Sequence, residues 1–122
     1  MNMAEIGVAE LLDTAAALRS AGSEVVVVDA DVFAQQPEGS LKALCTALGI
    51  PWDPAMLSWE PGPKECDGCW AKHWYSSVWA SSGFEPPGKK APRPFPQQCA
   101  GLRAEATPFY EALRPGALQP EE

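Results

Sequence analysis

Positive charge is scarce in this sequence. Its 9 lysine and arginine residues stand against 16 aspartate and glutamate residues, which gives a formal net charge of −7. Nonspecific nucleic-acid binding needs clustered basic side chains that displace counterions, and docking on an anionic membrane needs them as well. We therefore expect neither a nucleic-acid partner nor a membrane partner.

Long apolar runs are lacking too. The longest is Val25–Val28, far shorter than the roughly 18 residues of a membrane-spanning helix. The first residues show no basic segment followed by an apolar one, the pattern of a secretory signal. The sequence therefore predicts an intracellular, cytoplasmic protein.

Cysteine and histidine are few, with four residues of the first kind and one of the second. In an intracellular protein such thiols are expected to be reduced. A zinc site is the alternative hypothesis, because cysteine and histidine at these spacings can bind the metal tetrahedrally; its ligands would be Cys66, Cys69, His73 and Cys99. A single C-x-x-C is weak support, so the principal prediction contains no metal.

Apolar spacing divides the first half of the chain into a helix, a strand and a helix. Residues 4–21 are predicted to form an amphipathic helix, which Gly22 ends. Residues 24–30 are predicted to form a strand covered on both faces, because four consecutive valines cannot alternate between core and solvent. Pro37 begins the next predicted helix and Gly49 ends it.

Aromatic residues dominate the middle of the chain. After a compact loop over residues 50–63, tryptophans at a spacing of four predict a helix over residues 70–81. Tryptophan is costly to expose, so we expect at least three of the five tryptophans in the core. Residues 86–96 contain five prolines and are predicted to be an irregular connector.

The last segment is predicted to be helical over residues 97–113. Pro108 lacks a backbone N–H, so it either kinks this helix or begins a new one. The predicted domain comprises residues 1–114, and residues 115–122 are predicted to be a disordered tail.

One buried strand implies neighbours that pair with both of its edges. No other run in the sequence resembles Val25–Val28. We therefore expect an incomplete domain.

Consecutive motifs resemble the sulfotransferase family. Residues 25–33 (VVVVDADVF) and 37–52 (PEGSLKALCTALGIPW) are similar to its last core strand and the helix that follows. A subgroup found in bacteria, algae and plants, sometimes fused to or named after branched-chain aminotransferases, is resembled by residues 53–64 (DPAMLSWEPGPK), 67–68 (DG), 70–78 (WAKHWYSSV) and 82–84 (SGF). The resemblance extends over about residues 5–113.

The resemblance implies an α/β fold. The chain would be the C-terminal fragment of a P-loop sulfotransferase-like α/β sandwich, mostly helical, with one core parallel strand at about residues 24–30. The implied cofactor is 3′-phosphoadenylyl sulfate (PAPS), and the implied activity is sulfuryl transfer to a hydroxyl or amine acceptor.

Sulfuryl transfer needs a backbone nest and a basic side chain around the 5′-phosphosulfate. The sequence contains no G-x-x-x-x-G-K-[ST], and its only Gly-Lys cluster, Gly88-Lys89-Lys90, lies in the proline-rich connector. We therefore expect a truncated sulfotransferase-like protein that is inactive alone.

The resemblance also suggests which residues approach the nucleotide, since the segment after residue 76 would border it. The candidate cofactor-binding residues are Ser77, Ser81, Ser82, Lys89 and Lys90. A solvated polar loop is the alternative interpretation of the same residues.

The candidate acceptor pocket contains Asp31, His73, Trp74 and Tyr75. Asp31 follows the predicted strand at the edge where open α/β sheets bind ligands, although it could equally cap the next helix. His73 is the one histidine and a candidate base, with packing beside Trp74 as the alternative.

Two partners are consistent with an incomplete domain: a polypeptide that supplies the missing N-terminal half, or a second copy joined through exposed apolar surface. The alternative function is a small zinc-stabilised or noncatalytic interaction module.

Overall fold

The computed structural model describes residues 2–85 and 94–122. They divide into two compact units. The terminal unit comprises residues 2–30 and 94–119, and the central unit comprises residues 31–85 and 120–122. Each unit is described by itself.

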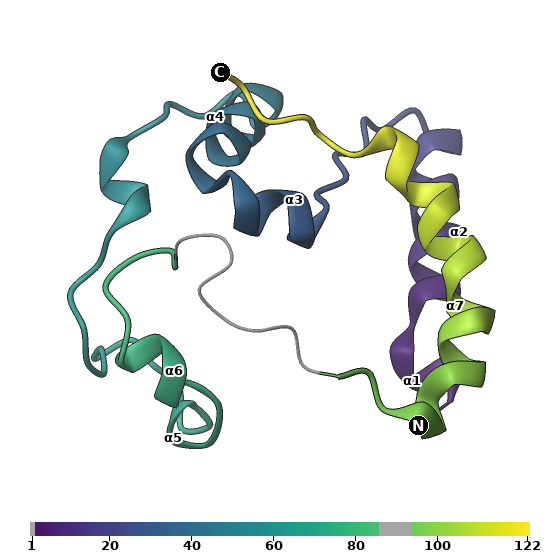
Figure 1. The fold of residues 1–122 in the computed structure, drawn as a ribbon. Helices are drawn as coiled ribbons and strands as arrows, with labels where there is room; N and C mark the ends of the chain where they lie inside the picture. The colour runs from purple at the N-terminus through teal and green to yellow at the C-terminus, as the bar shows by residue number, and fades with distance from the viewer. Residues whose placement is uncertain (1, 86–93) are drawn as a thin grey trace. The chain divides into compact units, whose positions relative to one another are not determined.

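Helices α2 (Val8–Ser20) and α7 (Ala100–Leu113) lie side by side and form the terminal unit (Figure 1). The predicted helix over residues 4–21 is broken, because Gly7 adopts a left-handed conformation (φ 70°) that ends α1 (Met3–Ile6). Asn2 caps α1 in a capping box with Glu5. The buried residues of this unit are Ala15 and Leu113.

The predicted strand over residues 24–30 is wrong for the part of the chain that the structure describes. Val27 makes one isolated parallel bridge, to Ala117, and its carbonyl accepts a hydrogen bond of 2.9 Å from the Leu118 N–H. A strand needs a continuous ladder, and Ala117 and its neighbours offer only this single pairing. Val28 remains 44% exposed, so the valines are not covered on both faces.

The fold of the described residues is accordingly mostly helical, with isolated bridges in place of a sheet. The expected α/β sandwich does not form within them. A helix that the sequence analysis missed, α3 (Ala30–Gln35), begins directly after the valine segment.

The central unit contains the predicted helix that begins at Pro37. Helix α4 (Pro37–Leu48) has proline in its first turn, and Gly49 ends it in the left-handed conformation (φ 66°), which confirms both predicted boundaries. Its buried face consists of Ser40, Ala43 and Cys45. A 3₁₀ turn, η1 (Pro54–Leu57), follows in the predicted loop, and Asp53 caps it.

The predicted helix over residues 70–81 is present as two short helices, α5 (Ala71–Trp74) and α6 (Ser76–Trp79), separated at Tyr75. The backbone keeps helical hydrogen bonding through this joint: Tyr75 donates to the Ala71 carbonyl, and Trp79 donates to the Tyr75 carbonyl. The buried residue here is Ala71.

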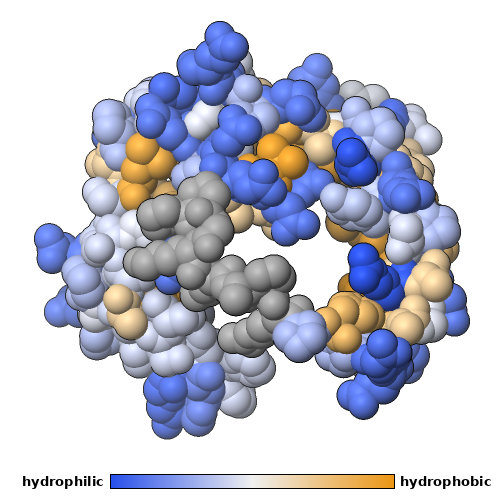
Figure 2. Space-filling view, viewed as in Figure 1, coloured by the Kyte–Doolittle hydropathy of each residue, from blue (hydrophilic) through white to orange (hydrophobic). Residues whose placement is uncertain are grey.

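The prediction that three tryptophans lie in the core is wrong. None of the five is buried, and Trp70 and Trp74 are 70% and 74% exposed. The buried apolar residues of the described central unit, Ala43, Cys45 and Ala71, are all small. Figure 2 shows apolar side chains (orange) reaching the surface among hydrophilic ones (blue).

Helix α7 follows a short 3₁₀ turn, η2 (Gln97–Cys99), and runs through Pro108 without restarting. Arg114–Gly116 then form η3. No helix within the described ranges is long and apolar enough to span a membrane.

The last residues contact helix α4. The Glu121 N–H donates to the Gly39 carbonyl at 3.0 Å. A side chain at position 39 would collide with the Glu121 carbonyl, so the close approach of tail and α4 requires glycine there. The proposed boundary at residue 114 and disorder in the tail remain predictions.

Candidate functional site

The three candidate serines line one hollow at the end of α6. Its volume is about 400 Å³, and its wall consists of Ser77, Ala80, Ser81, Ser82, Gly83, Phe84 and Glu85. We call it the serine hollow. Lys89 and Lys90, the other candidates for cofactor binding, lie outside the described residues.

A short pairing of two extended segments shapes the serine hollow. Ser58 and Gly83 form an antiparallel bridge, and the Trp59 N–H donates to the Ser82 carbonyl at 3.0 Å. A Cβ at position 83 would lie 3.0 Å from the Leu57 carbonyl, so glycine permits the close approach.

The Ser81 hydroxyl links Trp59 to the end of α6. Its hydroxyl accepts a hydrogen bond from Trp59 Nε1 (3.0 Å) and donates one to the Val78 carbonyl (2.7 Å). A serine hydroxyl has a single proton to donate, so Ser81 cannot also donate to a ligand. The hydroxyls of Ser77 and Ser82 have no such bond among the described residues and remain the candidates for ligand binding.

Asp67 fixes the preceding loop to α6. Its Oδ2 accepts hydrogen bonds of 2.8 Å from the Lys64 N–H and from Trp79 Nε1, while the Gly62 N–H donates to the Trp79 carbonyl. These two hydrogen bonds, with that from the Lys64 N–H having the larger effect, stabilise the carboxylate and lower the pKa of Asp67 below its ordinary value of 3.8. The sequence analysis missed this role of Asp67, although its Asp-Gly pair was part of the family resemblance.

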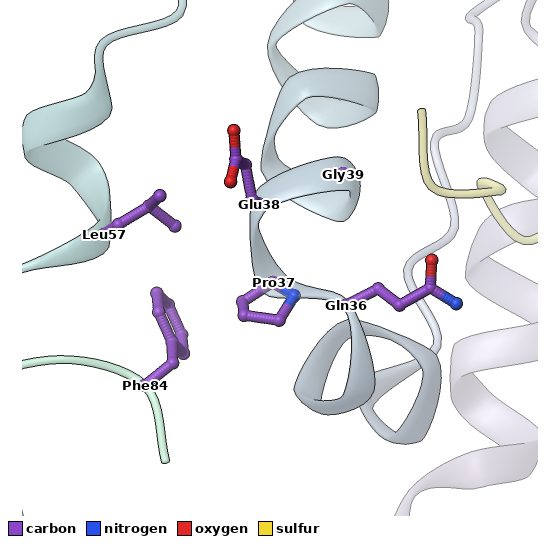
Figure 3. A pocket seen from close by; sticks show the side chains of 6 residues that line it. All are labelled: Gln36, Pro37, Glu38, Gly39, Leu57 and Phe84. Atoms are coloured by element: carbon purple, nitrogen blue, oxygen red, sulfur yellow. The ribbon is translucent and has the colours of Figure 1, made fainter. Parts of the chain in front are cut away.

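A second hollow, of about 430 Å³, lies at the start of α4. Figure 3 shows Leu57 and Phe84 facing Pro37 and Glu38, the first residues of that helix. Gln36 precedes the helix, and its side chain does not cap the first N–H groups. Glu38 pairs with Lys42 at 2.8 Å, so this hollow presents a carboxylate beside an apolar wall.

Phe84 forms part of both hollows. Its ring makes edge contacts with Phe33 and Trp59, at centroid distances of 5.6 and 5.5 Å. The sequence analysis did not select Phe33 or Phe84 as site residues. The available signal was the Ser82-Gly83-Phe84 motif, in which glycine positions an aromatic ring directly after the serines.

The four candidates for the acceptor pocket do not line these two hollows. Asp31 lies in the first turn of α3, and His73 and Trp74 belong to α5, which Tyr75 ends. The centroid of the His73 ring lies 6.1 Å from that of the Trp70 ring, and the backbone N–H of His73 donates to the Trp70 carbonyl at 2.9 Å. A role for these residues in acceptor binding remains a prediction.

The hypothetical zinc ligands do not form a site in the part of the chain that the structure describes, since no three cysteine, histidine or acidic side chains gather there. Cys66 and Cys69 are exposed free thiols in the central unit, and Cys99 belongs to the terminal unit.

The serine hollow fits only part of the cofactor that the resemblance implies. Ser77 and Ser82 can donate hydrogen bonds to phosphate oxygens. A carboxylate, that of Glu85, lies in the same wall, and none of the described wall residues is basic. Binding of PAPS by this chain remains a prediction.

Comparison with known proteins identifies the family. The family described as "Sulfotransferase domain" matches residues 2–117. The chain belongs to the sulfotransferase-domain family. No solved structure matches it.

Two similar proteins come from Arabidopsis thaliana. "Branched-chain-amino-acid aminotransferase-like protein 1" is 42% identical over 110 residues, and "Branched-chain-amino-acid aminotransferase-like protein 2" is 38% identical over 110 residues. Each alignment covers 90% of this chain but 20% of the relative, so the chain spans about a fifth of the length of these relatives.

Proposed function

We propose that this chain is the C-terminal part of a sulfotransferase domain and is inactive alone. In the complete domain, the activity would be transfer of a sulfuryl group from PAPS to a hydroxyl or amine acceptor. Family membership over residues 2–117 supports the class of activity. The absence of a G-x-x-x-x-G-K-[ST] motif from the 122 residues carries the proposal that another polypeptide segment must complete the site.

The chemistry explains why a second segment is needed. Negative charge builds on the bridging oxygen as the sulfuryl group leaves, and backbone N–H groups with a basic side chain stabilise that charge. Among the described residues, the walls of the two hollows contain Glu85 and Glu38, which pairs with Lys42, and no lysine or arginine. This chain would help to hold the nucleotide in place, because Ser77 and Ser82 would donate hydrogen bonds to its phosphate oxygens.

Isothermal titration with adenosine 3′,5′-bisphosphate tests whether the isolated chain can bind the nucleotide. We expect no micromolar binding by the isolated chain. Micromolar binding would show that the chain holds the nucleotide without a phosphate-binding nest, and the requirement for a second segment would then be wrong.

A chimera tests whether this chain takes part in nucleotide binding once another polypeptide segment completes the domain. The chain would replace the aligned 110 residues of aminotransferase-like protein 1, and the unmodified relative would be titrated in parallel. We expect both to bind the nucleotide, and Ser77→Ala or Ser82→Ala to weaken binding by the chimera about three- to tenfold, the effect of losing one or two hydrogen bonds. Ser76→Ala is the matched control because Ser76 is not in the wall of the serine hollow. Failure of both proteins to bind would contradict the proposed function.

A further inference from the structure

Several exposed apolar side chains lie on or beside the short helices α5 and α6, and Trp70 and Trp74 are the most exposed large apolar residues of the described chain. Trp70 and Trp74 are 70% and 74% exposed, Tyr75 is 43% exposed and Val78 is 51% exposed. Trp70, Trp74 and Val78 are spaced by four residues, and the helical hydrogen bonding continues through Tyr75, so they lie along one side of the α5–α6 segment. Tyr75 follows Trp74 in sequence and extends this exposed surface around the segment. We call the four residues the aromatic face.

The segment that carries the aromatic face contains no acidic residue. Residues 68–84 contain no aspartate or glutamate, although the whole chain has 16 acidic residues and a net charge of −7. Two copies of so acidic a chain repel each other wherever carboxylates face carboxylates. Residues 68–84 add no carboxylate to such a contact, although Asp67 borders them and bonds to Trp79. Lys72 has a stem long enough to keep its ammonium group in solvent at the rim.

The exposed area of the aromatic face limits the size of such a contact. An aromatic side chain offers roughly 150–250 Å², so at the observed exposed fractions the three aromatic residues present about 400 Å² per copy, to which Val78 adds a smaller share. Two copies would bury about 1,000 Å², which is the lower limit for a specific interface and less than the ~1,600 Å² of a standard one.

We propose that the aromatic face is a self-association surface, on which two copies of this chain form a weak, reversible dimer. Burial of apolar area drives the contact, and tryptophans at its centre contribute most of the binding energy. A symmetric dimer places the same face of each copy against its partner, so the interface closes and the assembly stops at two copies.

Sedimentation equilibrium across a range of protein concentrations tests this proposal. We expect the mass to rise from that of one 13.1 kDa chain toward that of two, and a higher salt concentration not to weaken the association, since the contact is apolar. A mass that stays at one chain throughout, or growth beyond two copies, overturns the proposal.

Charged substitutions locate the surface. Trp70→Lys and Trp74→Lys each alter a side chain that is at least 70% exposed, and each should raise the dimer dissociation constant at least about tenfold. The matched control is Leu11→Lys on α2, because Leu11 is 59% exposed but lies in the terminal unit. Circular dichroism verifies that each variant is folded. If Leu11→Lys abolishes the dimer while both tryptophan variants retain it, the aromatic face is not the contact.

Discussion

The terminal and central units are stabilised by different interactions. In the terminal unit, α2 and α7, with 13 and 14 residues, pack along their lengths (Figure 1). The central unit has shorter helices, and its tryptophan indoles donate hydrogen bonds to Ser81 and Asp67. The difference implies that the terminal unit is sensitive to lost apolar volume, whereas the central unit is sensitive to lost hydrogen bonds.

The largest expected effect is on the terminal unit. Leu113→Ala removes a side chain that is 8% exposed, and it should lower the free energy of unfolding by about 2–4 kcal/mol through lost burial and a residual cavity. Urea unfolding followed by circular dichroism measures the change. Leu11→Ala is the control, because Leu11 is 59% exposed and should change stability by less than about 0.5 kcal/mol. Equal effects of the two substitutions would show that α7 does not pack as described.

A smaller effect is expected from Ser81→Ala in the central unit. The substitution removes the acceptor for Trp59 Nε1 and the donor to the Val78 carbonyl, which should cost about 1–2 kcal/mol of unfolding free energy. Ser77→Ala should cost less than about 0.5 kcal/mol, since its exposed hydroxyl has no such bond among the described residues. Urea unfolding measures both variants. If Ser77→Ala destabilises more than Ser81→Ala, the assignment of one serine to structure and the other to ligand binding is reversed.

The smallest effect concerns acid sensitivity. The folded-state pKa of Asp67 lies below its ordinary value of 3.8. A group with a lowered folded pKa adds stability above its unfolded pKa, and this stability is lost as the pH falls through the folded value. The contribution of Asp67 should therefore be present above about pH 4 and disappear below it.

Titration of the Asp67 carboxyl carbon by NMR measures this pKa directly. Trp79→Phe removes the indole donor and should raise the pKa toward 3.8, while the Lys64 N–H still holds it partly down. An unchanged pKa in Trp79→Phe would mean that the indole bond is not formed in solution.

Local signals predicted the elements whose boundaries depend on one or two residues. Pro37 and Gly49 delimit α4 because proline fits a first helical turn and glycine adopts the left-handed conformation that ends a helix. The same property of Gly7 breaks the first predicted helix, which apolar spacing alone could not reveal. The family was identified correctly from the motifs of the middle third.

Long-range features were predicted less well because they depend on what packs against a segment. Val25–Val28 have the composition of a buried strand, but the one bridge at Val27 is not a ladder. The tryptophans have the composition of a core, but Ala71 is the buried residue on α5. The three candidate serines are close in sequence, and they line one hollow. Only the fold showed that the Ser81 hydroxyl is already hydrogen-bonded to Trp59 and Val78.

The ring of Phe84 lies in the walls of both hollows and makes an edge contact with the ring of Trp59. A molecule that binds in either hollow would contact the Phe84 ring and so change the surroundings of the Trp59 indole. The emission of Trp59 should therefore change when either hollow is occupied, and replacing the other four tryptophans by phenylalanine would isolate that signal.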